Sequence, residues 1–182
     1  MTQSEFYISI DVETAGPNPG NYALLSIGAS TVLEPVSSFY VELKPDKAAS
    51  QREALQISGL DMDKLAKDGE LPETAMQRFA DWVAEVTPPD SKAIFVAFNA
   101  PFDWMFVADY FHRYLGHNPF GYSALDIKAY FMGTHGMAWG KTGFEKVTKY
   151  YKMNHPLTHN ALQDAIDQAD VFRKMLEEAK KI

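Results

Sequence analysis

Apolar and polar positions in the first quarter of the chain follow the pattern of β-strands. Residues 6–16 begin with a short apolar run that ends in two carboxylates, Asp11 and Glu13, and further strands are predicted over residues 23–32 and 37–43. The connections between these runs are short and rich in turn residues. The pattern therefore predicts three consecutive antiparallel strands.

Helical spacing dominates the middle of the chain. Residues 45–70 are polar and mixed, with short helical pieces such as 51–57, and residues 72–86 carry apolar positions at the spacing of an amphipathic helix. Residues 93–98 are almost all apolar, which is typical of a strand covered on both faces. A helix is predicted from there to Leu115, with Asn99 as its capping residue ahead of Pro101.

The remaining segment completes a mixed pattern. Residues 122–127 indicate a short fifth strand that leads into a helix near 128–132, and residues 133–143 hold four glycines, which predicts a mobile loop. Helices over residues 144–151 and 161–179 follow. The order βββαβαβα predicts an α/β fold, a mixed five-stranded sheet flanked by helices, in a single domain over residues 1–182.

Composition narrows the class of protein. The 182 residues are 46% hydrophobic and 13% aromatic, contain no cysteine, and include no apolar run long enough to span a bilayer. With no basic and apolar leader at the N-terminus, these features fit a cytoplasmic enzyme. The net charge of −7 argues against a broad phosphate-binding surface but leaves room for a local site.

Two carboxylates end the first predicted strand. Side chains alternate faces along a strand, so Asp11 and Glu13 point the same way and Val12 points into the opposite layer. Two carboxylates this close repel each other unless a proton or a cation lies between them. A divalent metal with oxygen ligands would satisfy both, whereas an acidic strand end in solvent is the alternative interpretation.

Two further acidic positions lie where helices are predicted to begin. Asp103 falls in the first turn after the strand at 93–98, where an α/β sheet presents its chemistry, and a favourable interaction with the helix dipole is the alternative interpretation. Asn160 and Gln163 resemble a capping box, which places Asp164 in the first turn of the last helix. His159, in the preceding loop, could then reach towards Asp164 and accept a proton from water, or be an ordinary polar loop residue.

Together these segments resemble the DEDDh family of 3′–5′ exonucleases. The resemblance is carried by residues 9–16 with 23–29, by 98–103 and by 159–165, and residues 54–60 are similar to a family element near the substrate. It covers residues 6–175, and its first segment is most similar to the ribonuclease T branch, with the polymerase III proofreading branch also related. Phe98 and Ser58 depart from the polar residue or histidine common in relatives, which affects how the terminal nucleotide is held.

The resemblance implies a ribonuclease H-like fold and hydrolysis with two Mg²⁺ or Mn²⁺ ions. Asp11 would bridge the two ions, Glu13 and Asp164 would complete the first, and Asp103 would hold the second, partly through water. His159 would be the general base for the attacking water. The substrate would be the 3′ end of single-stranded RNA or DNA, and the products nucleoside 5′-monophosphates. The chemistry of the ligands agrees, because hard oxygen donors without cysteine favour these metals over zinc.

The resemblance also implies contacts to the substrate. Thr14 would meet the terminal ribose, Leu24 would act as a wedge against the terminal base, and Phe102 would pack close to the sugar. Asn99 completes this group of expected substrate-binding residues. Relatives near ribonuclease T are often dimers, so a homodimer is a further expectation.

Several residues leave alternatives open. Trp104 and Trp139 are favoured as packing residues over base-stacking ones. Lys146, Lys149 and Lys152 recur at a spacing of three, as either a basic edge that guides phosphates or a solvated face, and the solvated face is favoured.

Other functions are alternatives to nucleotide release. A zinc site at His155 and His159 is set aside because Pro156 lies between them. Two functional alternatives are a catalytically silent module for nucleic-acid binding or partner docking on the same fold, and a nuclease restricted to short oligonucleotides.

Overall fold

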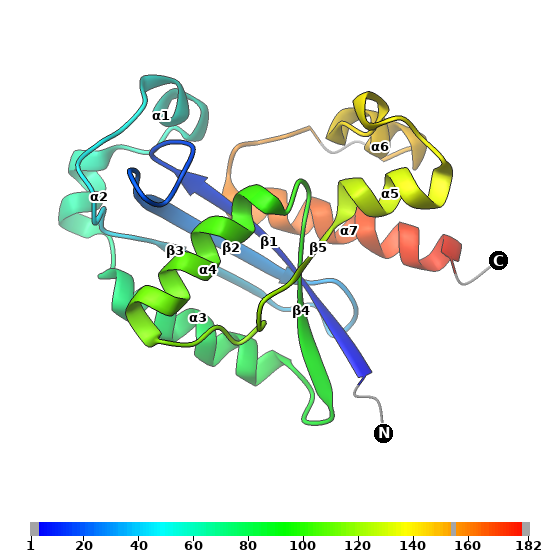
Figure 1. Cartoon of the computed structure of the whole chain (residues 1–182), viewed down its shortest axis with the longest axis horizontal. Helices are drawn as coiled ribbons and strands as arrows, with labels where there is room; N and C mark the ends of the chain where they lie inside the picture. The colour runs from blue at the N-terminus through cyan, green and yellow to red at the C-terminus, as the bar shows by residue number, and fades with distance from the viewer. Residues whose placement is uncertain (1–3, 154–155, 180–182) are drawn as a thin grey trace.

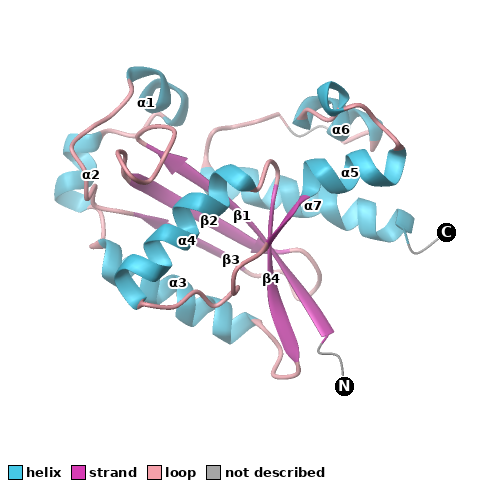
Figure 2. Cartoon of the chain, viewed as in Figure 1, coloured by secondary structure: helices cyan, strands magenta, loops and turns pink. Residues whose placement is uncertain are grey.

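Three antiparallel strands form one side of a mixed five-stranded sheet in the computed structural model, as the sequence predicted. The structure describes residues 4–153 and 156–179 (Figures 1 and 2). The sheet order is β3-β2-β1-β4-β5, with β4 and β5 parallel to β1. The strands are β1 (Ser4–Thr14), β2 (Leu24–Thr31), β3 (Ser38–Glu42), β4 (Ser91–Ala97) and β5 (Ala124–Asp126).

Helices cover both faces of this sheet. Ile8, Ile10 and Val12 of β1 pack into the larger core with α3 and α4, and the smaller core on the other face joins α5, α6 and α7. None of the helices in the described part of the chain is long and apolar enough to cross a membrane. The helices are α1 (Arg52–Ser58), α2 (Met62–Asp68), α3 (Pro72–Val86), α4 (Pro101–Leu115), α5 (Ile127–His135), α6 (Phe144–Tyr150) and α7 (Ala161–Ala179), with the 3₁₀ helix η1 (Trp139–Lys141).

Two local expectations differ from the structure. The loop predicted over residues 133–143 is shorter in the structure, because α5 continues to His135 and η1 occupies part of the remainder. Asn99 does not cap α4: Ala100 holds the N-cap position, no side chain caps the helix, and Asn99 adopts φ 67°. The carboxylate of Asp126 instead accepts hydrogen bonds from the backbone N–H groups of Asn99 (2.9 Å) and Ala100 (3.4 Å).

A glycine in β2 allows α7 to begin directly on the sheet. Gly28 pairs with Asp11 across the antiparallel ladder. A Cβ atom at Gly28 would lie 2.1 Å from the carbonyl carbon and oxygen of Ala161, the first residue of α7. Only glycine therefore permits this approach, which brings the start of α7 next to the Asp11 end of β1.

The pairing of β1 with β4 ends before β1 itself does. The last parallel pair is Ser9 with Val96, and β1 continues to Thr14. The backbone of β1 beyond Ser9 is therefore open on that edge, and α4 begins beside it (Figure 1).

Candidate active site

A cleft of about 440 Å³ lies at the carboxyl end of β1. Its walls come from β1, from α1, from the turn into α4 and from the segment that precedes α7. The residues that line it are Asp11, Val12, Glu13, Thr14, Ala54, Ile57, Phe98, Asn99, Phe102, Asp103, Leu157, His159 and Asp164. All five predicted catalytic positions and three of the four predicted substrate-binding positions thus line one cleft.

The strand alternation places the first two carboxylates as predicted. Val12 is buried in the core shared with α3 and α4, and Asp11 and Glu13 face the opposite layer, where α7 begins. The carboxylate Oδ1 of Asp11 accepts a 2.7 Å hydrogen bond from Nε2 of Gln168 on α7. The amide of Gln168 is 2% exposed, and its Oε1 accepts from the backbone N–H of Phe98 at 2.8 Å.

Asp103 reaches the same cleft from the other side of the sheet. It stands in the first turn of α4, as predicted, and is 4% exposed. Its Oδ1 accepts a hydrogen bond of 3.1 Å from the backbone N–H of Val12, on the stretch of β1 that β4 does not pair. This bond places Asp103 next to Asp11 and Glu13.

Asp164 organises the loop that carries His159. Its Oδ1 accepts from both the backbone N–H and the hydroxyl of Thr158, each at 2.9 Å, and its Oδ2 accepts from the backbone N–H of His159 at 2.9 Å. His159 has φ 54°, an uncommon conformation outside glycine that these bonds stabilise. One half of the predicted capping box is present, since Asn160 Oδ1 accepts from the backbone N–H of Gln163 at 3.1 Å.

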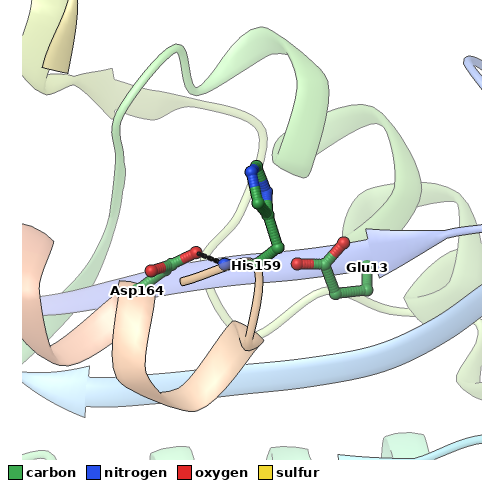
Figure 3. A group of neighbouring side chains, drawn as sticks. All are labelled: Glu13, His159 and Asp164. Carbon is green, nitrogen blue, oxygen red and sulfur yellow. Dashed lines mark hydrogen bonds between the residues drawn. The ribbon is translucent and has the colours of Figure 1, made fainter. Parts of the chain in front are cut away.

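Glu13, His159 and Asp164 form the most compact part of the site. One ligand atom from each lies within 4.8 Å of the others. Figure 3 shows the imidazole of His159 rising between the two carboxylates and away from β1, with the dashed bond from its backbone N–H to Asp164. The imidazole is exposed, so it is accessible to water and to a ligand in the cleft.

The carboxylates raise one another's pKa. Burial, followed by repulsion from Asp103, Glu13 and Asp164, raises the pKa of Asp11 well above its ordinary value, and the bond from Gln168 opposes this. Burial and the charge of Asp164 raise the pKa of Glu13 to about 8. Burial also raises the pKa of Asp103, against the hydrogen bond from Val12. These neighbouring carboxyl groups can all be ionised at once only when a positive charge compensates them.

The predicted substrate-binding residues divide into two groups. Thr14, Asn99 and Phe102 line the cleft, and the Thr14 hydroxyl donates to the Gly16 carbonyl at 2.9 Å. Leu24 does not line it, because its side chain is fully buried in the core. The structure therefore gives no support to the expected role of Leu24 as a wedge against the terminal base.

Four residues that support or line the site were missed by the sequence reasoning. Gln168, Asp126 and Thr158 hold catalytic segments by hydrogen bonds, and Leu157 lines the cleft. Gln168 follows Asp164 by one helical turn on the same face, and that spacing was a signal that could have identified it. The predicted substrate element at 54–60 contributes two cleft residues through α1.

The open alternatives are partly resolved. Trp104 packs edge-on against Phe95, with ring centroids 5.2 Å apart, which confirms it as a packing residue. Trp139 is 49% exposed and lies outside the cleft, with the Lys128 ammonium 3.9 Å from its ring centroid. His155, the other residue of the rejected zinc pair, lies outside the described residues.

Comparison with known proteins identifies the family. The family model for exonucleases of the RNase_T type matches residues 8–172. The 3′–5′ DNA exonuclease Cap18 of Escherichia coli is 43% identical over 183 residues, which cover 100% of this chain and 98% of the relative. Ribonuclease T of Photobacterium profundum is 32% identical, with 97% of this chain and 84% of the relative covered.

A solved structure agrees on the fold. The nuclease domain of 3′hExo, a DEDDh family member bound to rAMP, superposes with a TM-score of 0.80 at 13% identity, covering 96% of this chain and 93% of that one. The fold is accordingly the ribonuclease H-like sheet that the motifs implied. The chain belongs to the exonuclease family. It is an enzyme, a 3′–5′ exonuclease, as the motifs predicted.

Proposed function

We propose that this exonuclease hydrolyses single-stranded DNA from the 3′ end and releases nucleoside 5′-monophosphates one at a time. The convergence of four carboxylates and one imidazole on a single cleft carries the proposal. DNA is favoured over RNA because the relative at 43% identity, aligned along its whole length, is a DNA exonuclease.

Two Mg²⁺ or Mn²⁺ ions are the proposed cofactor, and the residues of the cleft fit them. The donors are carboxylate oxygens, which these hard cations prefer, and the chain has no cysteine. Asp11, Glu13, Asp103 and Asp164 would hold the ions, because their side chains line the same cleft. When bound, such ions activate water and stabilise charge on the phosphate and leaving oxygens.

His159 is the proposed general base. Its backbone N–H is fixed by Asp164, and its imidazole is exposed beside Glu13. It would take the proton of the water whose oxygen attacks phosphorus, while the bond from phosphorus to the 3′ oxygen of the preceding nucleotide breaks. That 3′ oxygen would take up a proton from water and become the new 3′ hydroxyl end. The terminal nucleotide then leaves with the phosphate on its 5′ carbon.

Three cleft residues are proposed to hold the terminal nucleotide. Thr14 would contact the sugar near the carboxylates, and Phe102, partly exposed in the first turn of α4, would pack against its apolar face. Asn99 is exposed at the turn into α4 and would offer its amide. A homodimer remains a prediction.

The test compares labelled single-stranded DNA and RNA of equal sequence, with Mg²⁺ and with EDTA. We expect Mg²⁺-dependent release of 5′-monophosphates from the 3′ end, faster from DNA. Faster release from RNA would reverse the proposed preference. Release from dinucleotides alone would support the short-oligonucleotide alternative. Binding of both polymers without release from any substrate would point to a silent binding module.

A further inference from the structure

The positive charge of this acidic protein is concentrated around α6. Between Ile127 and Met153 the sequence has five of its 17 lysine and arginine residues but one of its 24 acidic residues. The segment thus carries four excess positive charges on a chain of net charge −7. The lysines are Lys128, Lys141, Lys146, Lys149 and Lys152, and the acidic residue is Glu145.

A groove of about 590 Å³ runs along α6, and we name it the α6 groove. Phe144, Met153 and Leu157 supply its apolar surface, and Lys149 and Lys152 are exposed residues along it. Glu145 is the acidic residue among those that line it. Within the described residues, the structure gives neither lysine an ion-pair partner. Lys146 differs, because its ammonium donates to the Gly140 carbonyl at 2.8 Å.

The α6 groove adjoins the active-site cleft. Leu157, 51% exposed, lines both of them. Phe98 of the cleft meets Phe144 of the groove edge-on, with ring centroids 5.1 Å apart. Leu157 lies in the described segment 156–160 that precedes α7. A chain that leaves the catalytic residues past Leu157 therefore enters the α6 groove.

A further hollow continues this surface beyond α6. Lys149 lines it as well as the α6 groove, together with Lys141, Lys146 and the half-exposed ring of Tyr150. The three hollows are thus linked, the first two by Leu157 and the last two by Lys149. The apolar side chains and the lysines that line these hollows therefore continue together, away from the carboxylates.

We propose that the α6 groove binds the nucleotides of single-stranded DNA that lie upstream of the 3′-terminal one. This inference rests on the proposed function for the direction of the strand. Lys149 and Lys152 would contact phosphates, and the apolar side chains of the groove would contact sugars and bases. Charge complementarity favours DNA as the occupant, because the acidic remainder of the surface repels a polyanion and this segment attracts it.

The test replaces both groove lysines together, as Lys149→Gln with Lys152→Gln. Lys92→Gln with Lys174→Gln is the matched control, since both are exposed lysines that line neither the cleft nor the α6 groove. Binding of 5′-fluorescein-labelled dT₁₂ is measured by anisotropy in an Asp11→Asn background, so that the ends are not consumed. We expect roughly tenfold weaker binding for the groove pair and a salt slope smaller by about 1.4, from two lost phosphate contacts at about 0.7 each.

Turnover provides the second measurement. In the active protein, the ratio of kcat/KM for dT₁₂ to that for the dinucleotide should fall in the groove pair and not in the control pair. If the groove pair keeps the wild-type ratio and salt slope and still releases nucleotides, the proposal that the α6 groove binds DNA would be overturned. The proposed function would still stand. If the wild type releases no nucleotide but binds dT₁₂, and the groove pair binds it more weakly, DNA binding in the α6 groove would be supported. The proposed function would then be overturned.

A second copy of the chain is the competing occupant. Light scattering of wild type and both pairs distinguishes it from DNA. A change of oligomeric state confined to the groove pair, with dT₁₂ affinity unchanged, would assign the surface to a second copy and overturn the proposal. An unchanged mass with weakened dT₁₂ binding supports it.

Discussion

Gln168 on α7 donates a 2.7 Å hydrogen bond from Nε2 to the carboxylate Oδ1 of Asp11 on β1. The same amide accepts from the backbone N–H of Phe98 at 2.8 Å, so one buried side chain joins β1, the turn into α4 and α7. An amide suits this position because it provides a donor to a carboxylate and an acceptor to an N–H group. Gln168 thus positions a carboxylate proposed to hold the metals.

Replacing Gln168 tests this positioning role. Gln168→Leu leaves the Phe98 N–H without its acceptor and the Asp11 carboxylate free to rotate. We expect a loss of about 10-fold to 100-fold in kcat or in apparent Mg²⁺ affinity, measured by Mg²⁺ titration of nucleotide release. Gln77→Leu is the control, because Gln77 is an exposed residue of α3 whose amide donates to Asp81, and neither residue lines the cleft. A rate that falls equally at every Mg²⁺ concentration in both variants, in step with lost thermal stability, would indicate general destabilisation instead.

Asp11→Asn separates activity from stability. The amide removes a metal ligand, so we expect nearly all activity to disappear. It also removes one of the mutually repelling carboxylates and keeps an oxygen that accepts from Gln168. The metal-free variant should therefore be more stable than metal-free wild type, and about 1 kcal/mol would raise Tm by roughly 2–4 °C. Calorimetry in EDTA measures this, and a lower Tm would contradict mutual repulsion.

The metal-free protein should lose stability as pH rises. The folded-state pKa of Glu13 is raised to about 8 from its ordinary 4.5, and that of Asp103 is also raised. A group whose pKa is raised by folding stabilises the folded state fully below its unfolded pKa, and that contribution disappears as pH rises through the folded value. Tm in EDTA should thus fall between about pH 5 and pH 9.

Without metal, the folded protein favours protonated carboxyl groups at the site, whereas bound metal would favour the ionised carboxylates. Mg²⁺ should raise Tm more at pH 8 than at pH 6, since ligands must be ionised to bind it. Glu13→Gln should flatten the pH dependence of Tm in EDTA, because it removes one of the titrating groups. A Tm in EDTA that increases over this range would show that other groups dominate.

A separate carboxylate, Asp46, titrates at acid pH and does not change Tm in the range between pH 5 and pH 9. Burial alone would raise the pKa of Asp46, but hydrogen bonds from Tyr110, Arg113 and Tyr114 lower it to about 2. Its contribution is present above the unfolded pKa near 4 and disappears as pH falls towards 2. Asp46 therefore contributes to a loss of stability below pH 4, a range in which the raised pKa values of Glu13 and Asp103 predict little change.

Local geometry predicted where each carboxylate lies, and the resemblance to the exonuclease family joined them into one site. Alternation along one strand puts Asp11 and Glu13 on one face, and the first turns of two helices present Asp103 and Asp164. These features depend on neighbours only a few residues away. The three antiparallel strands were predictable for the same reason, since short connections allow little else.

Contacts between distant segments could not be predicted in this way. The Gln168 amide meets a carboxylate 157 residues earlier, and no local pattern encodes that pair. Leu24 is buried because α4 packs over its strand, where the Tyr110 hydroxyl accepts a 2.8 Å hydrogen bond from the Leu24 N–H. Asn99 was expected to cap α4 by its residue type, and the carboxylate of Asp126 binds that turn instead.

Gly28→Ala tests whether the site depends on the close contact between β2 and α7. The new methyl group would meet backbone atoms of Ala161, which have no rotamer with which to move aside. Overpacking of this kind costs about 1–3 kcal/mol or more, and it would push the start of α7, with His159 and Asp164, away from Asp11. We therefore expect both a lower Tm and a fall in kcat beyond what the lost stability explains. Gly133→Ala is the matched control, because a methyl group there would have no atom within 4 Å and alanine favours the helix α5 by up to about 1 kcal/mol. Unchanged kcat in Gly28→Ala, measured well below its Tm, would mean that the helix start can shift without disturbing the carboxylates.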